Sequence, residues 1–154
     1  MRKKILLLIP IFIVCFFVYK FFSIEKVTPE KTSEIAQLIS QTAENLNVGE
    51  SKEVNIKSTI NSTYDKILIV PPYYPENKLK SMIDANLAKS IAKSIPLNER
   101  FHLFIINEDQ IQRNIELNEK FATKGNQLLI LTSSENLLVT KIGQSDHHWF
   151  EITK

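Results

Sequence analysis

A long apolar run near the N-terminus constrains this chain more than any other feature. After the basic residues Arg2, Lys3 and Lys4, residues 5–24 read ILLLIPIFIVCFFVYKFFSI, with Lys20 as the only charge. A helix of this length, at about 1.5 Å per residue, spans the roughly 30 Å hydrocarbon core of a bilayer. We therefore predict a single transmembrane anchor at 5–24, with Lys20 extending to the outer interface.

The flanking charges predict the orientation of this anchor. The denser positive charge lies in residues 1–4, and such flanks stay on the cytoplasmic side of a membrane. We expect a basic cytoplasmic tip, a single-pass anchor in the cell membrane and an extracytoplasmic remainder. A cleaved signal peptide is the main alternative, but its cleavage zone requires small residues and here contains Phe21, Phe22 and Ile24.

The remaining chain has the size and charge of one modest domain. Of the 154 residues, we assign 25–52 to a membrane-proximal helix and connection, and 53–154 to an extracytoplasmic domain. The only cysteine, Cys15, lies in the apolar run, so we expect neither a disulfide nor a thiol nucleophile in the domain. Residues 25–154 carry 15 basic and 17 acidic side chains without a basic cluster, which argues against nucleic acid as a partner.

Hydrophobic periodicity beyond the anchor predicts an α+β domain with a mainly antiparallel sheet and two or three helices. Thr28-Pro29-Glu30 resembles a helix start, while Pro75 and Pro96 bracket a second helical pattern. The predicted elements are a helix at 29–47, strands at 53–58 and 66–70, a helix between Pro75 and Pro96, a strand at 101–106, a segment at 109–122 that fits helix or strand, a hairpin of 128–132 with 137–142, and a short strand around 149–152.

The most distinctive stretch surrounds the firmest predicted strand. Residues 64–75 read YDKILIVPPYYP, in which the apolar run ends at two prolines. This stretch resembles a group of small, uncharacterised extracytoplasmic membrane-anchored proteins and lipoproteins, in which an aromatic-Asp-Lys strand ends in Pro-Tyr-x-Pro or Pro-Tyr-Thr. Tyr64 stands at the aromatic position, and Tyr74 at a position often taken by threonine. The resemblance implies an extracytoplasmic location and no particular reaction.

Tyr73 and Tyr74 are the residues that we expect to bind a partner. Prolines on both sides predict a rigid turn at the end of the strand, because each proline fixes its own φ. A phenol ring presents an apolar body with a polar tip, which suits a protein contact surface. The structural alternative is that one tyrosine packs over the core while the prolines only fix the turn.

No motif in the sequence indicates catalysis or a cofactor. The serines lie in no Gly-x-Ser-x-Gly elbow, and the isolated Gly125 and Gly143 form no phosphate-binding loop. His147 and His148, together with Asp146, Glu151 and His102, carry metal-ligating groups, but adjacent residues of a strand point to opposite faces, so His147 and His148 cannot readily bind one ion. We therefore expect no catalytic residue, no metal and no cofactor.

Together these patterns favour a membrane-anchored binding or interaction protein of a bacterial cell envelope, with another envelope protein as its partner. The alternative is a small cell-surface hydrolase with an unrecognised site, which a deep pocket with converging His, Asp and Tyr side chains would favour. A structural subunit that pairs through its membrane helix is a third interpretation, but residues 5–24 contain no small-xxx-small pattern.

Overall fold

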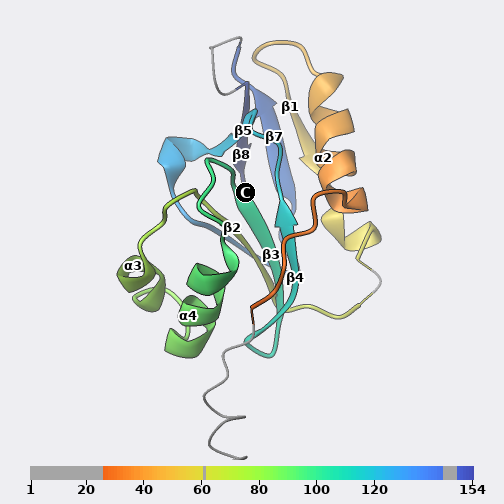
Figure 1. Cartoon of the computed structure of the whole chain (residues 1–154). Coiled ribbons are helices and arrows are strands. Elements are labelled where there is room, and N and C mark those ends of the chain that lie inside the picture. Colours follow the sequence, from red (N-terminus) through yellow and green to blue (C-terminus); the bar gives the residue numbers. More distant parts are fainter. Residues whose placement is uncertain (1–25, 61, 144–148) are drawn as a thin grey trace, which may run out of the picture.

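A computed structural model describes residues 26–60, 62–143 and 149–154 (Figure 1). These residues confirm the predicted α+β class, with mostly antiparallel sheets and three α-helices. The elements are α2 (Glu34–Glu44), β1 (Ser51–Val54), the 3-10 helix η1 (Ile56–Ser58), β2 (Lys66–Val70), α3 (Glu76–Lys80), α4 (Ala85–Ser94), β3 (His102–Asn107), β4 (Gln110–Glu116), β5 (Phe121–Thr123), the 3-10 helix η2 (Lys124–Asn126), β6 (Leu129–Thr132), β7 (Leu137–Lys141) and β8 (Phe150–Thr153).

The first sheet has the strand order β4-β3-β2-β6, and its central strands are buried on both faces. Its central strands β2 and β3 are almost continuously apolar because α3 and α4 cover one face while α2 and the second sheet cover the other. Leu68 and Phe104 face the helices and pair across these strands. The prediction of a central strand at 66–70 is confirmed at both ends, and the strand predicted at 101–106 is β3.

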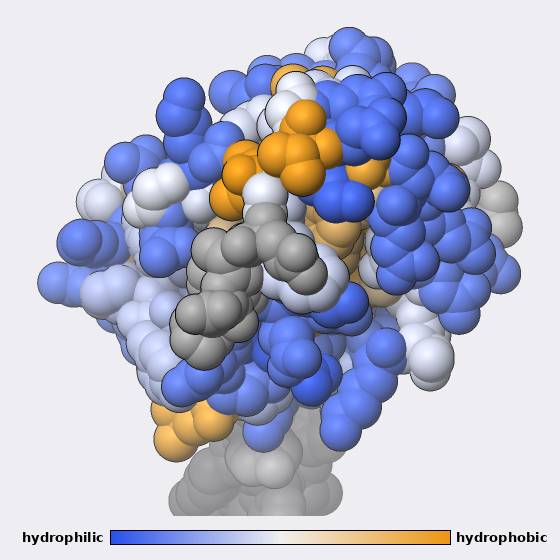
Figure 2. Space-filling view, turned by 90° about the horizontal axis from the view of Figure 1, so that it is seen from above, coloured by the Kyte–Doolittle hydropathy of each residue, from blue (hydrophilic) through white to orange (hydrophobic). Residues whose placement is uncertain are grey.

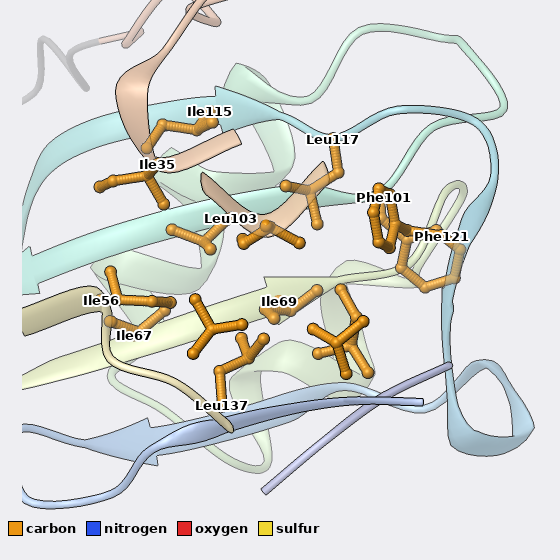
Figure 3. Close-up of a cluster of buried hydrophobic side chains, with 14 of the residues drawn as sticks. Ile35, Ile56, Ile67, Ile69, Phe101, Leu103, Ile115, Leu117, Phe121 and Leu137 are labelled. Carbon is orange, nitrogen blue, oxygen red and sulfur yellow. The ribbon is translucent and has the colours of Figure 1, made fainter. Parts of the chain in front are cut away.

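The second sheet has the order β1-β7-β8-β5, in which only the β5–β8 pair is parallel. A single hydrophobic cluster fills the space between the two sheets and α2. Figure 3 shows how Ile35 from α2, Ile69 and Leu103 from the first sheet, and Leu137 from the second converge there. The short final strand predicted around 149–152 is β8.

The predicted hairpin of 128–132 with 137–142 is wrong. Its two halves are strands, but they belong to different sheets: β6 pairs with β2, whereas β7 pairs with β1 and β8. Leu131 and Leu137 both point into the shared core, so the connection between them crosses from one sheet to the other. A short polar connection therefore marks a change of sheet here.

The predicted helix at 29–47 is shorter and starts later, because α2 begins after Ser33. The Ser33 hydroxyl caps α2 by accepting a hydrogen bond from the N–H of the second helical residue (3.2 Å). Glu30 is instead extended beside β4: its N–H donates to the Asn114 carbonyl (2.7 Å) and its carbonyl accepts from the Glu116 N–H (3.1 Å). Pairing with a sheet edge thus overrides a local helix signal.

The helix predicted between Pro75 and Pro96 is interrupted. Asp84 begins a new helix because its carboxylate accepts from the N–H groups of Asn86 (2.8 Å) and Leu87 (3.0 Å). The chain thus forms α3 and α4 with a short connection, and the two pack against each other as a helical pair on the first sheet (Figure 1).

The segment 109–122, which fitted helix or strand, consists of β4 and the start of β5. Glu108 and Asp109 both have left-handed backbones (φ 49° and 55°) and form the tight turn that folds β4 back onto β3. The strand predicted at 53–58 is also shorter, because β1 ends at Val54 and a 3-10 turn follows it.

The predicted anchor at 5–24 lies outside the described residues. Among the residues that are described, no helix combines the length and apolar character needed to cross a bilayer.

Candidate functional site

The turn after β2 holds Tyr73 in an unusual backbone conformation. Its φ of 56° is left-handed, and its side chain is 63% exposed. This conformation is unfavourable for a bulky L-residue because Cβ approaches the following carbonyl. Pro72 precedes it and Pro75 stands at the start of α3, so restrained residues lie on both sides of the turn.

The neighbouring Tyr74 is half-buried and packs against the cluster under α3 and α4. Its hydroxyl lies 3.8 Å from Sδ of Met82, a residue in the connection between those helices that is 51% exposed. Tyr74 thus supports the turn, while Tyr73 projects into solvent. We refer to Tyr73, Tyr74 and Met82 as the tyrosine-turn surface.

The aromatic-Asp-Lys motif before this turn has a structural role. Asp65 accepts a hydrogen bond from the Glu108 N–H (2.6 Å), and Lys66 forms an ion pair with Asp109 (2.7 Å). Both side chains therefore fix the turn between β3 and β4, and Tyr64 packs against the core. The motif stabilises the sheet that carries Tyr73, rather than forming a site itself.

A buried polar cluster joins the start of the described chain to the first sheet and α4. The Asn114 side-chain amide donates to the carbonyls of Val27 (3.1 Å) and Ser94 (3.0 Å). Its Oδ1 must then act as the acceptor from Nδ1 of His102, 2.9 Å away. The neutral His102 ring is therefore protonated at Nδ1, and its Nε2 has no partner among the described residues.

Burial lowers the pKa of His102 from 6.5, because the imidazolium form loses its hydration. The hydrogen bond with Asn114 and the charge of Glu116 raise this pKa, while the charge of Arg100 lowers it. The net direction is downward, so the folded protein holds His102 neutral at pH values where an unfolded chain would protonate it.

We expect this histidine to make the protein less stable in mild acid. The unfolded state binds more protons than the folded state once the pH falls below 6.5, so the free energy of unfolding decreases from about pH 7 to pH 5. His102→Gln should flatten this slope in urea-unfolding experiments. A variant in which the two other histidines are replaced serves as the control and should keep the pH dependence of the wild type. An equal slope in wild type and His102→Gln would show that His102 does not cause the loss of stability.

A polar cleft of about 320 Å³ lies between the start of α2 and the end of β4. Its lining includes Lys31, Gln37, Arg100 and the buried Glu116. The Glu116 carboxylate accepts hydrogen bonds from the side chains of Arg100 and Asn98. The cleft contains no His, Asp or Tyr. It therefore lacks the converging side chains that would favour a hydrolase.

Other predicted ligand residues are dispersed or undescribed. His147 and His148 lie outside the described residues, and His102 is enclosed in the polar cluster. Among the described residues no three metal-ligating side chains come together. The sequence interpretation missed the His102–Asn114 cluster, because His102 at the start of β3 and Asn114 inside β4 give no local signal of their contact.

Three further large apolar residues are exposed in the described part of the chain, and the most exposed is Leu97 (93%), which follows α4. Val48 (68% exposed) and Ile142 (51%) border the second sheet, and Val48 shares a cavity with Gly143 and Trp149. Figure 2 shows the end of the molecule opposite α3 and α4, where a few hydrophobic residues interrupt a largely hydrophilic surface.

No family model, curated protein or solved structure matches this chain, so its function has to be argued from its own residues.

Proposed function

We propose that this protein is a membrane-anchored, extracytoplasmic interaction protein of the cell envelope, held by residues 5–24 and binding a protein partner through Tyr73 and Tyr74. The observation that carries the binding role is the exposed ring of Tyr73 on a left-handed backbone. The apolar run and the positive flank before it support the anchor and its orientation.

The energetics of the turn support a binding role. A left-handed L-residue costs roughly 1–2 kcal/mol, which glycine would avoid. The solvent-exposed ring of Tyr73 recovers little of this through packing. Strain held at an exposed side chain is typical of functional positions. Tyrosine contributes much of the binding energy in protein interfaces, and an exposed methionine such as Met82 adapts to different partner shapes.

We expect a photoreactive residue at position 73 to capture a discrete protein in living cells. Val48, which is exposed to a similar extent in the connection between α2 and β1, provides the control position. Mass spectrometry should identify an adduct formed from position 73 and not from 48. Protease added to intact cells should degrade a C-terminal tag, because the domain is proposed to lie outside the membrane. An absent adduct would reject the protein partner, and a protected tag would reject the orientation.

Tyr73→Gly separates binding from folding. Glycine relieves the left-handed strain, so we expect the free energy of unfolding to stay the same or to rise by up to about 1 kcal/mol. Co-purification of the captured partner should nevertheless be lost, because the ring is gone. Unchanged co-purification in a folded Tyr73→Gly variant would show that the ring does not contribute to binding.

A further inference from the structure

The N-terminal end of the described chain is built into the fold. The Val27 N–H donates to the Ser94 hydroxyl (3.0 Å), and the Val27 carbonyl accepts from Asn114 (3.1 Å). Glu30 receives two hydrogen bonds from the Arg113 guanidinium (2.9 and 2.6 Å). From residue 27 onward the chain therefore has a fixed position beside the last turn of α4.

This attachment leaves a very short tether to the proposed anchor. Only residues 25 and 26 separate Ile24, the last residue of the apolar run, from Val27. The three residue steps from Ile24 to Val27 reach about 10 Å when extended, so an anchored chain holds the adjacent part of the fold close to the bilayer. Figure 1 shows that α3 and α4 lie at the same end of the molecule as this start of the described chain.

The segment that forms the same pair of helices has a net positive charge. Residues 76–94 contain four lysines and two acidic residues, whereas residues 26–154 as a whole contain 15 basic and 16 acidic residues. The α3–α4 segment is thus positive within a domain that is otherwise negative. Such a segment attracts an anionic surface within about one Debye length, roughly 10 Å at 0.1 M salt.

The two acidic residues of this segment interact with groups inside the segment itself. Glu76 forms an ion pair with Lys80 (2.6 Å), and its pKa is lowered by that hydrogen bond first and then by the charges of Lys80, Lys89 and Lys93. Asp84 is occupied in capping α4. Lys89 and Lys93, one turn apart on the exposed side of α4, form no ion pair with any described residue.

We infer that the outer face of α3 and α4 contacts the anionic lipid headgroups of the membrane that holds the anchor, with Lys89 and Lys93 as the principal contacts. This inference rests on the proposed membrane anchor. The tether brings the lysines within electrostatic reach, and each lysine near an anionic leaflet contributes favourably to the contact. The contact fixes the orientation of the domain and leaves the connection between α2 and β1 at the opposite end (Figure 1).

The test uses the full chain in lipid nanodiscs, with Cys15→Ser so that one introduced cysteine can carry a fluorophore. Asn86→Cys places it on the exposed side of α4, and Val48→Cys places it on the α2–β1 connection. A quencher attached to lipid headgroups should reduce emission from position 86 much more than from position 48. The difference should be larger in phosphatidylcholine mixed with phosphatidylglycerol than in phosphatidylcholine alone.

Replacing both Lys89 and Lys93 by glutamine should weaken the contact about 30-fold and bring quenching at position 86 towards that at position 48. The double variant Lys52→Gln/Lys57→Gln, around β1, is the charge-matched control and should have no effect. If quenching at position 86 stays the same when the α4 lysines are replaced, or when the anionic lipid is left out, the headgroup contact is overturned. A chain that does not enter nanodiscs at all would instead overturn the anchor, together with the inference that rests on it.

Discussion

Asn114→Ala is expected to lower the free energy of unfolding by about 3 kcal/mol. The Asn114 side chain satisfies two backbone carbonyls, those of Val27 and Ser94, and accepts from the buried ring of His102. Alanine leaves all three groups without partners, and each unsatisfied buried group costs about 1–3 kcal/mol, part of which water entering the site would recover. The same substitution removes the hydrogen bond between the Val27 carbonyl and β4, but leaves the bond from the Val27 N–H to the Ser94 hydroxyl.

Urea unfolding of the full chain in detergent micelles provides the measurement. Trp149, the only tryptophan, is half-buried and lies under the Lys120 ammonium group, 4.5 Å from the ring centre, so its emission should report the loss of the fold. Asn86→Ala is the matched control because Asn86 is exposed, and its effect should stay within about 0.5 kcal/mol. Equal effects of the two substitutions would show that the cluster contributes no net stability.

The elements that the sequence predicts well are those whose signals are local. The run from Ile67 to Val70 is uniformly apolar and ends at Pro71, so β2 can be recognised without knowing its neighbours. The α+β class follows from the same patterns, because alternating and helical periods occur in separate segments.

The elements that it predicts poorly depend on distant partners. Nothing near Glu30 indicates that Asn114, far along the chain, supplies the edge beside which it extends. Similarly, β6 and β7 have the pattern of a hairpin, yet each strand finds its partner in a different sheet. Asp84 is a recognisable cap residue, but the continuous apolar spacing around it conceals the break between two helices.

Part of the candidate site can be predicted from the sequence. The prolines around Tyr73 and Tyr74 indicate a rigid turn, but only the structure separates the exposed ring of Tyr73 from the half-buried ring of Tyr74. A left-handed φ at Tyr73 has no sequence signal, since glycine or asparagine is the usual residue there. The short attachment beside α4 is also a tertiary feature, because it depends on where Val27 is bound.

Phe104→Ala is expected to cause the largest loss, about 4 kcal/mol of the free energy of unfolding. Phe104, on β3, is fully buried between the first sheet and the α3–α4 pair, where it shares a cluster with Leu68 and Ile91. Truncating a buried phenylalanine removes its transfer free energy and leaves a cavity, which together cost about 3–5 kcal/mol. The loss should appear in the same urea titration.

Tyr73→Ala removes another aromatic ring and provides the control for this experiment. Both alanine and tyrosine are strained at a left-handed position, and the Tyr73 ring is mostly in solvent, so its removal should change stability by less than about 1 kcal/mol. A similar loss for the two variants would contradict the assignment of Phe104 to the core and Tyr73 to the surface. The expected contrast follows from where each ring lies: the Phe104 ring holds α3 and α4 on the sheet, and the Tyr73 ring remains available to a partner.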